Sequence, residues 1–157
     1  MDKPPITSQG YKALQEELKN LIKVDRPKII QDISDARAHG DLKENAEYHA
    51  AKDKQGFIEG RIQKLNHLIG NAHIIEIAKI KSNKVQFGAT VTYEDLDSEE
   101  TTTWKIVGEE EADVKRNLIS YKSPIAKALI GKEEGDEITI KIPKGTLEVE
   151  ITEVKYV

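Results

Sequence analysis

Residues 7–36, TSQGYKALQEELKNLIKVDRPKIIQDISDA, carry the apolar spacing that decides the fold of the first half of the chain. Apolar side chains recur here every three or four residues, the period of an amphipathic α-helix. They are Tyr11, Leu14, Leu18 and Leu21, then, in a shifted register, Ile22, Ile29, Ile33 and Ala36. Thr7 is the expected N-cap, with Ile6 and Tyr11 as a hydrophobic staple. Pro27 predicts a kink rather than a stop, because the apolar stripe continues beyond it.

A second helical pattern follows a break at His39-Gly40-Asp41. Its apolar positions are Ala46, Ala50, Phe57, Ile58, Ile62, Leu65, Ile69 and Ala72. Two helices of about 30 residues would each be roughly 45 Å long. Joined by a tight turn, they predict an antiparallel coiled-coil hairpin. A rod of this length buries little apolar surface per residue, so we expect its length to serve a function that needs reach.

The second half changes to the alternating pattern of β-strands. The expected strands are Phe87–Tyr93, Thr101–Val107, Glu137–Ile142 and Leu147–Tyr156. Pro143-Lys144-Gly145 predicts a hairpin turn between the last two. Ser123 as N-cap, Pro124 at the first helical position and Gly131 after the last turn predict a short helix.

The sequence therefore predicts an α+β protein. Its N-terminal antiparallel coiled-coil hairpin is followed by a small antiparallel β-sheet domain with a short helix, the outline of the FK506-binding (FKBP-like) fold. The expected domains are residues 1–77 for the helical finger, 78–83 for a linker and 84–157 for the sheet domain.

Composition excludes several classes of protein. The chain has 157 residues, of which 38% are apolar and 33% are charged, a globular balance. It has no cysteine, which excludes disulfide scaffolds, thiolate metal sites and a thiol nucleophile. No apolar stretch is long enough to span a bilayer, and the N-terminus lacks the apolar core of a secretory signal. We expect a cytoplasmic protein without a membrane partner.

The charge balance argues against a free-standing nucleic-acid binder. The formal net charge is −4, and all of it falls on residues 79–157, with 12 Lys and Arg against 16 Asp and Glu. Binding to phosphates requires a concentrated basic face. If nucleic acid is involved, another protein is expected to hold most of it.

Acidic side chains gather where the two predicted helices meet. Asp41 and Glu44 are three residues apart, a spacing that on a helix places both carboxylates on one face and lets them offer oxygen ligands to Mg²⁺. Two ligands cannot complete six-coordinate Mg²⁺, so water, substrate or a partner would supply the rest. The structural alternative is a capping box, with Asp41 as N-cap and Glu44 at N3. The two interpretations are compatible.

Other candidate sites have weaker signals. The four histidines, His39, His49, His67 and His73, show no metal-binding spacing and are expected at the surface. The acidic runs 97–100 and 109–111 are expected to be solvated loops. No nucleophile elbow or phosphate-binding loop is present, so a self-contained hydrolase is not expected. The aromatic residues of the second half show no spacing typical of a prolyl-isomerase pocket, which favours a docking domain over an isomerase or chaperone.

Three stretches resemble the Gre family of bacterial transcription elongation factors. They are ARAHGDLKENAEYHAAK at residues 36–52, QGFIEGRI at 55–62 and SPIAKALIGK at 123–132. The resemblance covers essentially the whole chain in order. It implies a coiled-coil finger that enters the secondary channel of bacterial RNA polymerase and an FKBP-like domain docked at the channel rim.

The resemblance also implies roles for particular residues. Asp41 and Glu44 would help the polymerase hold a catalytic Mg²⁺ and orient the attacking water, so that backtracked RNA is cut internally and a new 3′ end is left in register for synthesis. The isolated chain would then bind Mg²⁺ only weakly, and the chain would be an accessory factor rather than an enzyme. Arg37 and Lys52 would contact the RNA, with ordinary surface ion pairs as the alternative.

Ser123 and Pro124 match the segment that docks at the polymerase rim, and the helix cap described above is the alternative. A different class of function also stays open, a regulator that blocks the polymerase channel without promoting cleavage. Asp41 and Glu44 match the cleavage-competent pattern and favour the first function.

Overall fold

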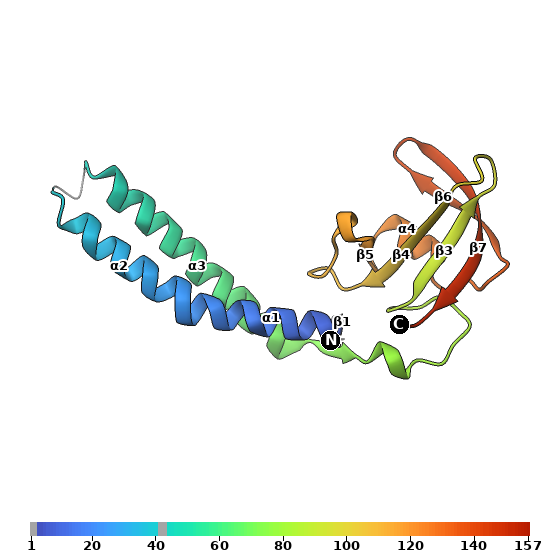
Figure 1. The fold of residues 1–157 in the computed structure, drawn as a ribbon, viewed down its shortest axis with the longest axis horizontal. Helices are drawn as coiled ribbons and strands as arrows, with labels where there is room; N and C mark the ends of the chain where they lie inside the picture. Colours follow the sequence, from blue (N-terminus) through green and yellow to red (C-terminus); the bar gives the residue numbers. More distant parts are fainter. Residues whose placement is uncertain (1–2, 41–43) are drawn as a thin grey trace. The chain divides into compact units, whose positions relative to one another are not determined.

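The computed structural model describes residues 3–40 and 44–157, which form two compact units (Figure 1). The hairpin unit is Tyr11–Ala72; the sheet unit joins the residues up to Gly10 to His73–Val157. This division differs from the predicted domains 1–77, 78–83 and 84–157, because the first residues and residues 73–83 group with the sheet. No helix in the described ranges is long and apolar enough to cross a membrane.

The first arm of the hairpin is one continuous run of helix. Its parts are α1 (Ser8–Asn20), the π-helical segment η1 (Leu21–Asp25) and α2 (Arg26–Arg37). Pro27 lies in the first turn of α2, and the helix continues past it, as predicted. The backbone N–H of Arg26 bonds to the Leu21 carbonyl five residues back. This wider turn relieves the clash that a proline ring makes with the turn before it.

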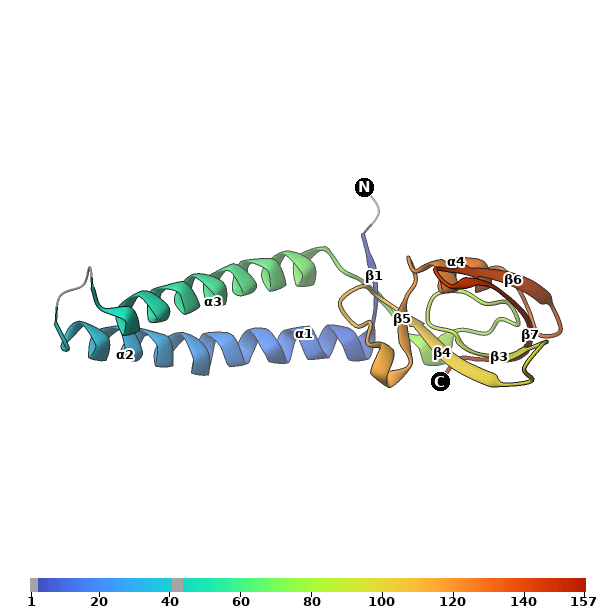
Figure 2. The ribbon, with the colours of Figure 1, turned by 90° about the horizontal axis from the view of Figure 1, so that it is seen from above.

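The second arm, α3 (Ala46–Asn71), runs antiparallel to the first, which confirms the predicted hairpin (Figure 2). An apolar seam joins the arms. Its buried members are Ile29, Ala51, Ile58 and Ile62, with Leu18, Leu21 and Ile33 packed against them. Phe57 was predicted in this apolar stripe, but its side chain is 77% exposed. The stripe follows Ile58 and Ile62, and Phe57 lies about 100° around the helix from Ile58.

Two forked ion pairs connect the arms on either side of this seam. Arg26 donates to both carboxylate oxygens of Glu59, each at 2.8 Å. Arg61 donates to both oxygens of Glu17, at 2.6 and 2.9 Å. The hydrogen bond from Arg61 lowers the pKa of the Glu17 carboxyl. Bidentate pairs of this kind fix geometry as well as adding attraction, so they hold the register of the two arms.

The sheet unit contains a curled five-stranded sheet with the order β5-β4-β3-β7-β6. Its strands are β3 (Thr90–Asp95), β4 (Thr101–Val107), β5 (Leu118–Ser120), β6 (Glu137–Ile142) and β7 (Gly145–Lys155). The predicted bounds of β4 and β6 are confirmed, as is the turn before Gly145. The short strand β5 was not predicted; it pairs parallel with β4, so the sheet is mixed rather than wholly antiparallel. The predicted α+β class is confirmed.

A short helix, α4 (Pro124–Leu129), packs on the sheet. Ala126 and Leu129 point into the core beneath it and are fully buried. The helix begins and ends as predicted, with Ser123 as N-cap and Gly131 in a left-handed conformation at φ +90°. The buried core that supports α4 comprises Val85, Ala89, Val91, Tyr93, Ile106, Ile119, Ile140, Val149 and Ile151.

A small parallel pair of strands, which was not predicted, joins the first residues to the sheet unit. β1 (Pro5–Thr7) pairs with β2 (His73–Ile75). Thr7 ends β1 and caps α1, because its Oγ1 accepts the Gly10 N–H at 3.0 Å, as predicted. A 3₁₀ turn, η2 (Ile77–Lys79), follows β2.

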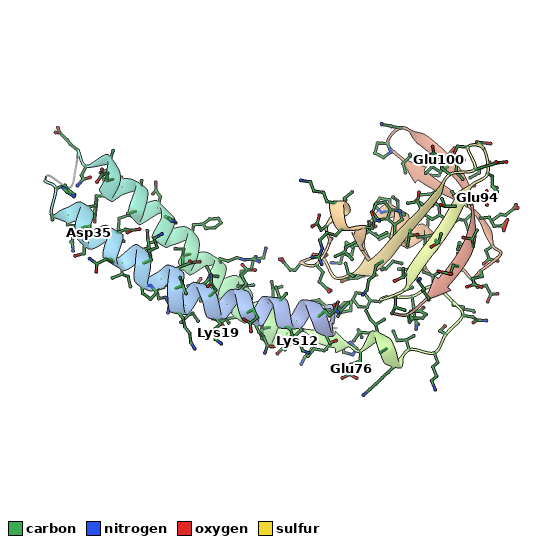
Figure 3. All side chains as sticks on the ribbon, in the orientation of Figure 1. Lys12, Lys19, Asp35, Glu76, Glu94 and Glu100 are labelled. Carbon is green, nitrogen blue, oxygen red and sulfur yellow. The ribbon has the colours of Figure 1, made fainter. Side chains whose placement is uncertain are left out.

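The two acidic runs differ in their surroundings. Residues 97–100 form an exposed turn between β3 and β4, with Glu100 at the surface, as predicted (Figure 3). In the run 109–111, Glu109 forms an ion pair with Lys122 at 2.7 Å. Glu111 is half-buried and bonds to Thr7, so the prediction of a solvated loop is wrong for this residue. The contact is invisible in local sequence because it joins residues 104 positions apart.

Candidate functional site

The predicted functional carboxylates, Asp41 and Glu44, belong to the segment between α2 and α3. α2 ends at Arg37, and Gly40 has the positive φ of +134° that favours glycine. Asp41 lies outside the described residues. Glu44 is described, and it lies in a turn before α3 rather than on the helix.

Asn45, not the predicted acidic pair, caps α3. Its Oδ1 accepts the Tyr48 N–H at 3.0 Å, and its Nδ2 donates to the Ala36 carbonyl at 2.6 Å. The side chain therefore closes the start of α3 and ties it to the end of α2. Because α3 begins at Ala46, Glu44 is not at N3, and the predicted capping box is wrong for this residue. The predicted shared helix face is wrong for the same reason.

The Glu44 carboxylate is left available by this arrangement. The side chain is exposed, and no hydrogen bond or ion pair joins it to another described residue. Carboxylate oxygens are ligands that Mg²⁺ prefers. Within residues 3–40 and 44–157, no three His, Asp or Glu side chains are placed to hold a metal ion together. Glu44 can therefore offer oxygen to an ion whose other ligands come from elsewhere.

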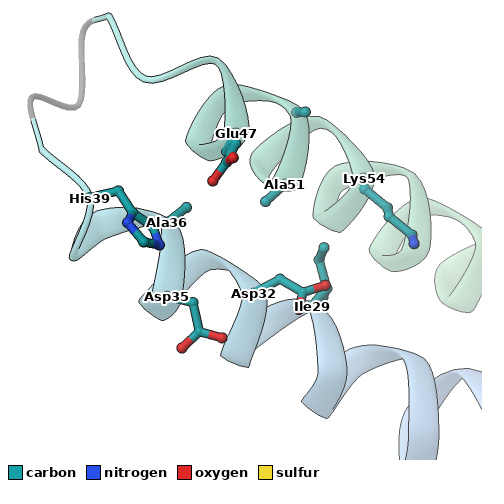
Figure 4. Close-up of a pocket in the computed structure, with 9 residues that line it drawn as sticks. Ile29, Asp32, Asp35, Ala36, His39, Glu47, Ala51 and Lys54 are labelled. Carbon is teal, nitrogen blue, oxygen red and sulfur yellow. The ribbon is translucent and has the colours of Figure 1, made fainter.

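A groove of about 430 Å³ lies between α2 and α3 beside this turn (Figure 4). Ile29, Ala36 and Ala51 form its apolar floor. Polar side chains surround the floor, namely Asp32, Asp35, His39, Glu47 and Lys54. Carboxylates outnumber the single lysine, so the groove repels phosphate groups. Sequence reasoning missed the groove because its lining comes from two helices whose register is set only by packing.

The two predicted RNA-contacting residues are both exposed. Arg37 ends α2 and Lys52 lies in the second turn of α3. The Lys52 Nζ donates to Gln55 Oε1 at 3.2 Å. Across the described part of the chain, no ion pair links Arg37 or Lys52 to an acid. Their charges are therefore open to an anionic partner.

The predicted docking residues lie at the start of α4. Ser123 Oγ accepts the Ala126 N–H at 3.2 Å, so the predicted helix cap is present. Pro124 is exposed. The preceding residues are held in place by side-chain contacts: Tyr121 packs edge-on against Phe87 at 5.8 Å, and the ion pair with Glu109 raises the pKa of Lys122.

Aromatic residues of the sheet unit form hydrogen bonds through their polar groups. Trp104 Nε1 donates to the Tyr93 hydroxyl at 3.0 Å, and burial raises the pKa of Tyr93. The Tyr156 hydroxyl donates to the Lys84 carbonyl and accepts the Gln86 N–H at 3.2 Å. The polar ends of these side chains are thus used in the fold.

Replacing Asn45 tests which residue caps α3. Asn45→Ala is expected to lower the free energy of unfolding of the helical hairpin by about 1 kcal/mol, the usual cost of a lost N-cap. Glu44→Ala, the matched control, is expected to change it by less than about 0.5 kcal/mol. Urea unfolding followed by circular dichroism at the helical band measures both. A larger loss for Glu44→Ala would restore the capping box.

Comparison with known proteins agrees with this architecture. A family model described as "Transcription elongation factor, N-terminal" matches residues 4–74, and one described as "Transcription elongation factor, GreA/GreB, C-term" matches residues 80–156. Together they span both units. The chain belongs to the GreA/GreB family of transcription elongation factors.

Individual relatives cover nearly the full length. The transcription elongation factor GreA of Trichlorobacter lovleyi is 58% identical over 152 residues, covering 97% of this chain and 96% of the relative. GreA of Halorhodospira halophila is 57% identical over 157 residues, covering 99% of each. Among solved structures, the Gfh1 protein of Thermus thermophilus is 27% identical, with a TM-score of 0.45, covering 97% of this chain and 98% of that one.

Proposed function

We propose that the protein stimulates RNA cleavage by bacterial RNA polymerase in backtracked, arrested complexes, by lending the carboxylates of Asp41 and Glu44 to the polymerase active site. Family membership supports the elongation role. The observation that carries the proposal is the Glu44 carboxylate, which is exposed and bonds to no described residue, while Asn45 caps the helix. The protein acts in the cytoplasm, as an accessory factor rather than an enzyme.

The tip residues fit a shared Mg²⁺. Two carboxylates are too few for a closed octahedral site, and they match the hard oxygen ligands that Mg²⁺ takes. Bound Mg²⁺ would lower the pKa of the attacking water and stabilise negative charge on the reacting phosphate. Glu44 supplies one oxygen ligand and Asp41 a second, and the polymerase and water supply the rest. Because Glu44 makes no bond to residues 3–40 or 44–157, it can bind an ion without losing a contact to them.

Arg37 and Lys52 contact the extruded RNA. Both are exposed, one near the end of the first arm and one near the start of the second. Their long cationic side chains attract the phosphates of the RNA. The acidic groove between the helices repels phosphates, so we assign the RNA contact to Arg37 and Lys52 rather than to the groove. In this arrangement they hold the RNA near the tip, and the carboxylates act on the metal.

The sheet unit docks at the rim of the polymerase secondary channel through Ser123 and Pro124. Pro124 is exposed at the first turn of α4, and Ser123 uses its hydroxyl to cap that helix. The cap and the docking role are compatible, because the cap fixes the shape of the surface that Pro124 presents. The hairpin then supplies the reach into the channel.

An arrested elongation complex with 5′-labelled and 3′-labelled RNA tests the proposal. Added protein is expected to accelerate the appearance of a shortened 5′-labelled RNA and a short 3′ fragment, after which the polymerase resumes synthesis. Binding to polymerase without faster cleavage would overturn this function and favour the channel-blocking regulator. No binding would overturn both.

A further inference from the structure

The groove between α2 and α3 is lined by alanines where larger side chains would close the seam. Ala36 on α2 and Ala50 and Ala51 on α3 leave about 430 Å³ open above an apolar floor. Elsewhere in the hairpin the seam is filled by leucine and isoleucine, namely Leu18, Leu21, Ile58 and Ile62. A longer apolar side chain at position 50 would bury more surface between the arms. The packing of the two arms therefore gains nothing from the gap.

The rim of this groove carries carboxylates that the hairpin leaves unpaired. Asp32 is half-buried and Glu47 is exposed, and neither bonds to any residue in 3–40 or 44–157. Figure 4 shows Glu47 pointing from α3 toward α2. The third carboxylate, Asp35, accepts only the amide of Gln31, at 2.8 Å. Lys54, the single lysine of the lining, makes no ion pair with a described residue. The groove is therefore negative, and its own side chains do not neutralise it.

An apolar floor below a negative rim fits the side chain of a lysine or an arginine. The methylene stem of such a side chain packs on apolar surface, and its charged end reaches the carboxylates. A bound metal ion fits less well, since no three His, Asp or Glu side chains of the described ranges are placed to hold one together. A phosphate is repelled by the carboxylates. The charge and the floor together favour a basic side chain of another protein.

We infer that this groove receives a lysine or arginine side chain from the wall of the polymerase channel, an inference that rests on the proposed function. In that function the hairpin is the part of the protein that enters the channel, so the groove meets protein there. Asp32 comes from the first arm and Glu47 from the second, so a cationic group between them contacts both arms. The contact adds affinity for the polymerase and takes no part in holding the metal.

Two variants remove the groove in different ways. Ala50→Leu fills it and keeps every charge, whereas Asp32→Asn with Glu47→Gln removes two charges and keeps the shape. Both are expected to fold, because Ala50 and Glu47 are exposed and Asp32 bonds to no described residue. Thermal unfolding followed by circular dichroism checks this, and Ala50→Leu is expected to melt at or above the temperature of the wild type.

Matched controls place the same changes outside the groove. Ala13→Leu adds the same side chain to an exposed position of α1. Asp53→Asn with Glu16→Gln removes two exposed acids from the same hairpin. Neither control touches a residue that lines the groove.

Binding of the full-length protein to bacterial core RNA polymerase free of nucleic acid tests the inference, by competition with labelled wild-type protein. Both groove variants are expected to raise the half-saturating concentration about tenfold, the scale of a lost hydrogen bond between charged groups. Both controls are expected to stay within about twofold of the wild type. Added salt is expected to weaken the binding of the wild type more steeply than that of the carboxylate variant, because salt screens charge pairs.

Other results would overturn the inference. Unchanged affinity in both groove variants would mean that the groove stays empty in the complex. A loss in Ala50→Leu alone would mean that the occupant is apolar rather than basic. A loss that appears only when RNA is present would assign the groove to RNA. A wild-type dimer that Ala50→Leu dissociates, seen by sedimentation, would assign it to a second copy of the chain.

Cleavage kinetics tell failure of this inference from failure of the proposed function. At saturating protein, both groove variants are expected to cleave backtracked RNA within about twofold of the wild-type rate, with the loss confined to the half-saturating concentration. If the wild type accelerates cleavage and the groove variants bind as tightly as it does, only the groove inference fails. If the wild type binds polymerase without accelerating cleavage, the proposed function fails, and the binding comparison still decides whether the groove is occupied. No binding by the wild type would overturn both.

Discussion

Asp41→Asn combined with Glu44→Gln is expected to lower the maximal rate of RNA cleavage in a backtracked complex on the order of 100-fold, the scale seen when a group that stabilises transition-state charge is removed. The change removes two negative charges and keeps side-chain size. Because Asn45 rather than Glu44 caps α3, the hairpin is expected to stay folded. Polymerase affinity, measured by competition with the wild-type protein, is expected to stay within about threefold.

A matched double variant controls for the loss of charge. Asp53→Asn with Glu16→Gln removes two exposed acids from the helices of the same hairpin. It is expected to cleave within about twofold of the wild type, because neither residue is at the tip. Equal losses in the two double variants would assign the effect to the overall charge of the finger. Undiminished cleavage by the tip variant would leave the finger as a steric device.

Leu129→Ala is expected to lower the free energy of unfolding of the sheet unit by about 3 kcal/mol, the usual cost of a large cavity in a core. Leu129 is the last residue of α4, and it is fully buried in the core of the sheet unit, 0% exposed. Its loss also loosens the helix that presents Ser123 and Pro124. Docking to the polymerase is therefore expected to weaken along with stability.

Ile130→Ala is the matched control for this cavity. Ile130 follows Leu129 in sequence but is 38% exposed, so its truncation is expected to cost less than about 1 kcal/mol. Urea unfolding monitored by Trp104 fluorescence in the sheet unit measures both variants. Equal losses would contradict the assignment of Leu129 to the core.

Elements with strong local signals could be predicted from the sequence. The alternation of apolar and polar residues predicts β4 and β6. The Ser-Pro pair and the later glycine predict the start and end of α4, because these residue types favour helix ends. Both signals lie within the element itself. The strands β1, β2 and β5 were missed. Each has only three residues, too few for a pattern, and each pairs in parallel with a strand that does not adjoin it through a tight turn.

The local geometry around Glu44 could not be predicted from sequence spacing. Glu44 was assigned to a helix because its spacing from Asp41 suits one, whereas Asn45 caps the helix by bonding both Tyr48 and Ala36. The second bond joins the two arms and cannot be read from local spacing. Glu111 was assigned to solvent for the same reason, since its partner Thr7 is 104 residues away.

The most direct test of the central claim is the Mg²⁺ dependence of cleavage in the backtracked complex, with saturating wild-type protein or saturating Glu44→Gln. If Glu44 helps hold the catalytic ion, the Mg²⁺ concentration for half-maximal cleavage is expected to rise about tenfold in the variant, the usual effect of a lost metal contact. Polymerase binding should be unchanged. An identical Mg²⁺ dependence for the two proteins would contradict the claim that the tip carboxylates share the metal.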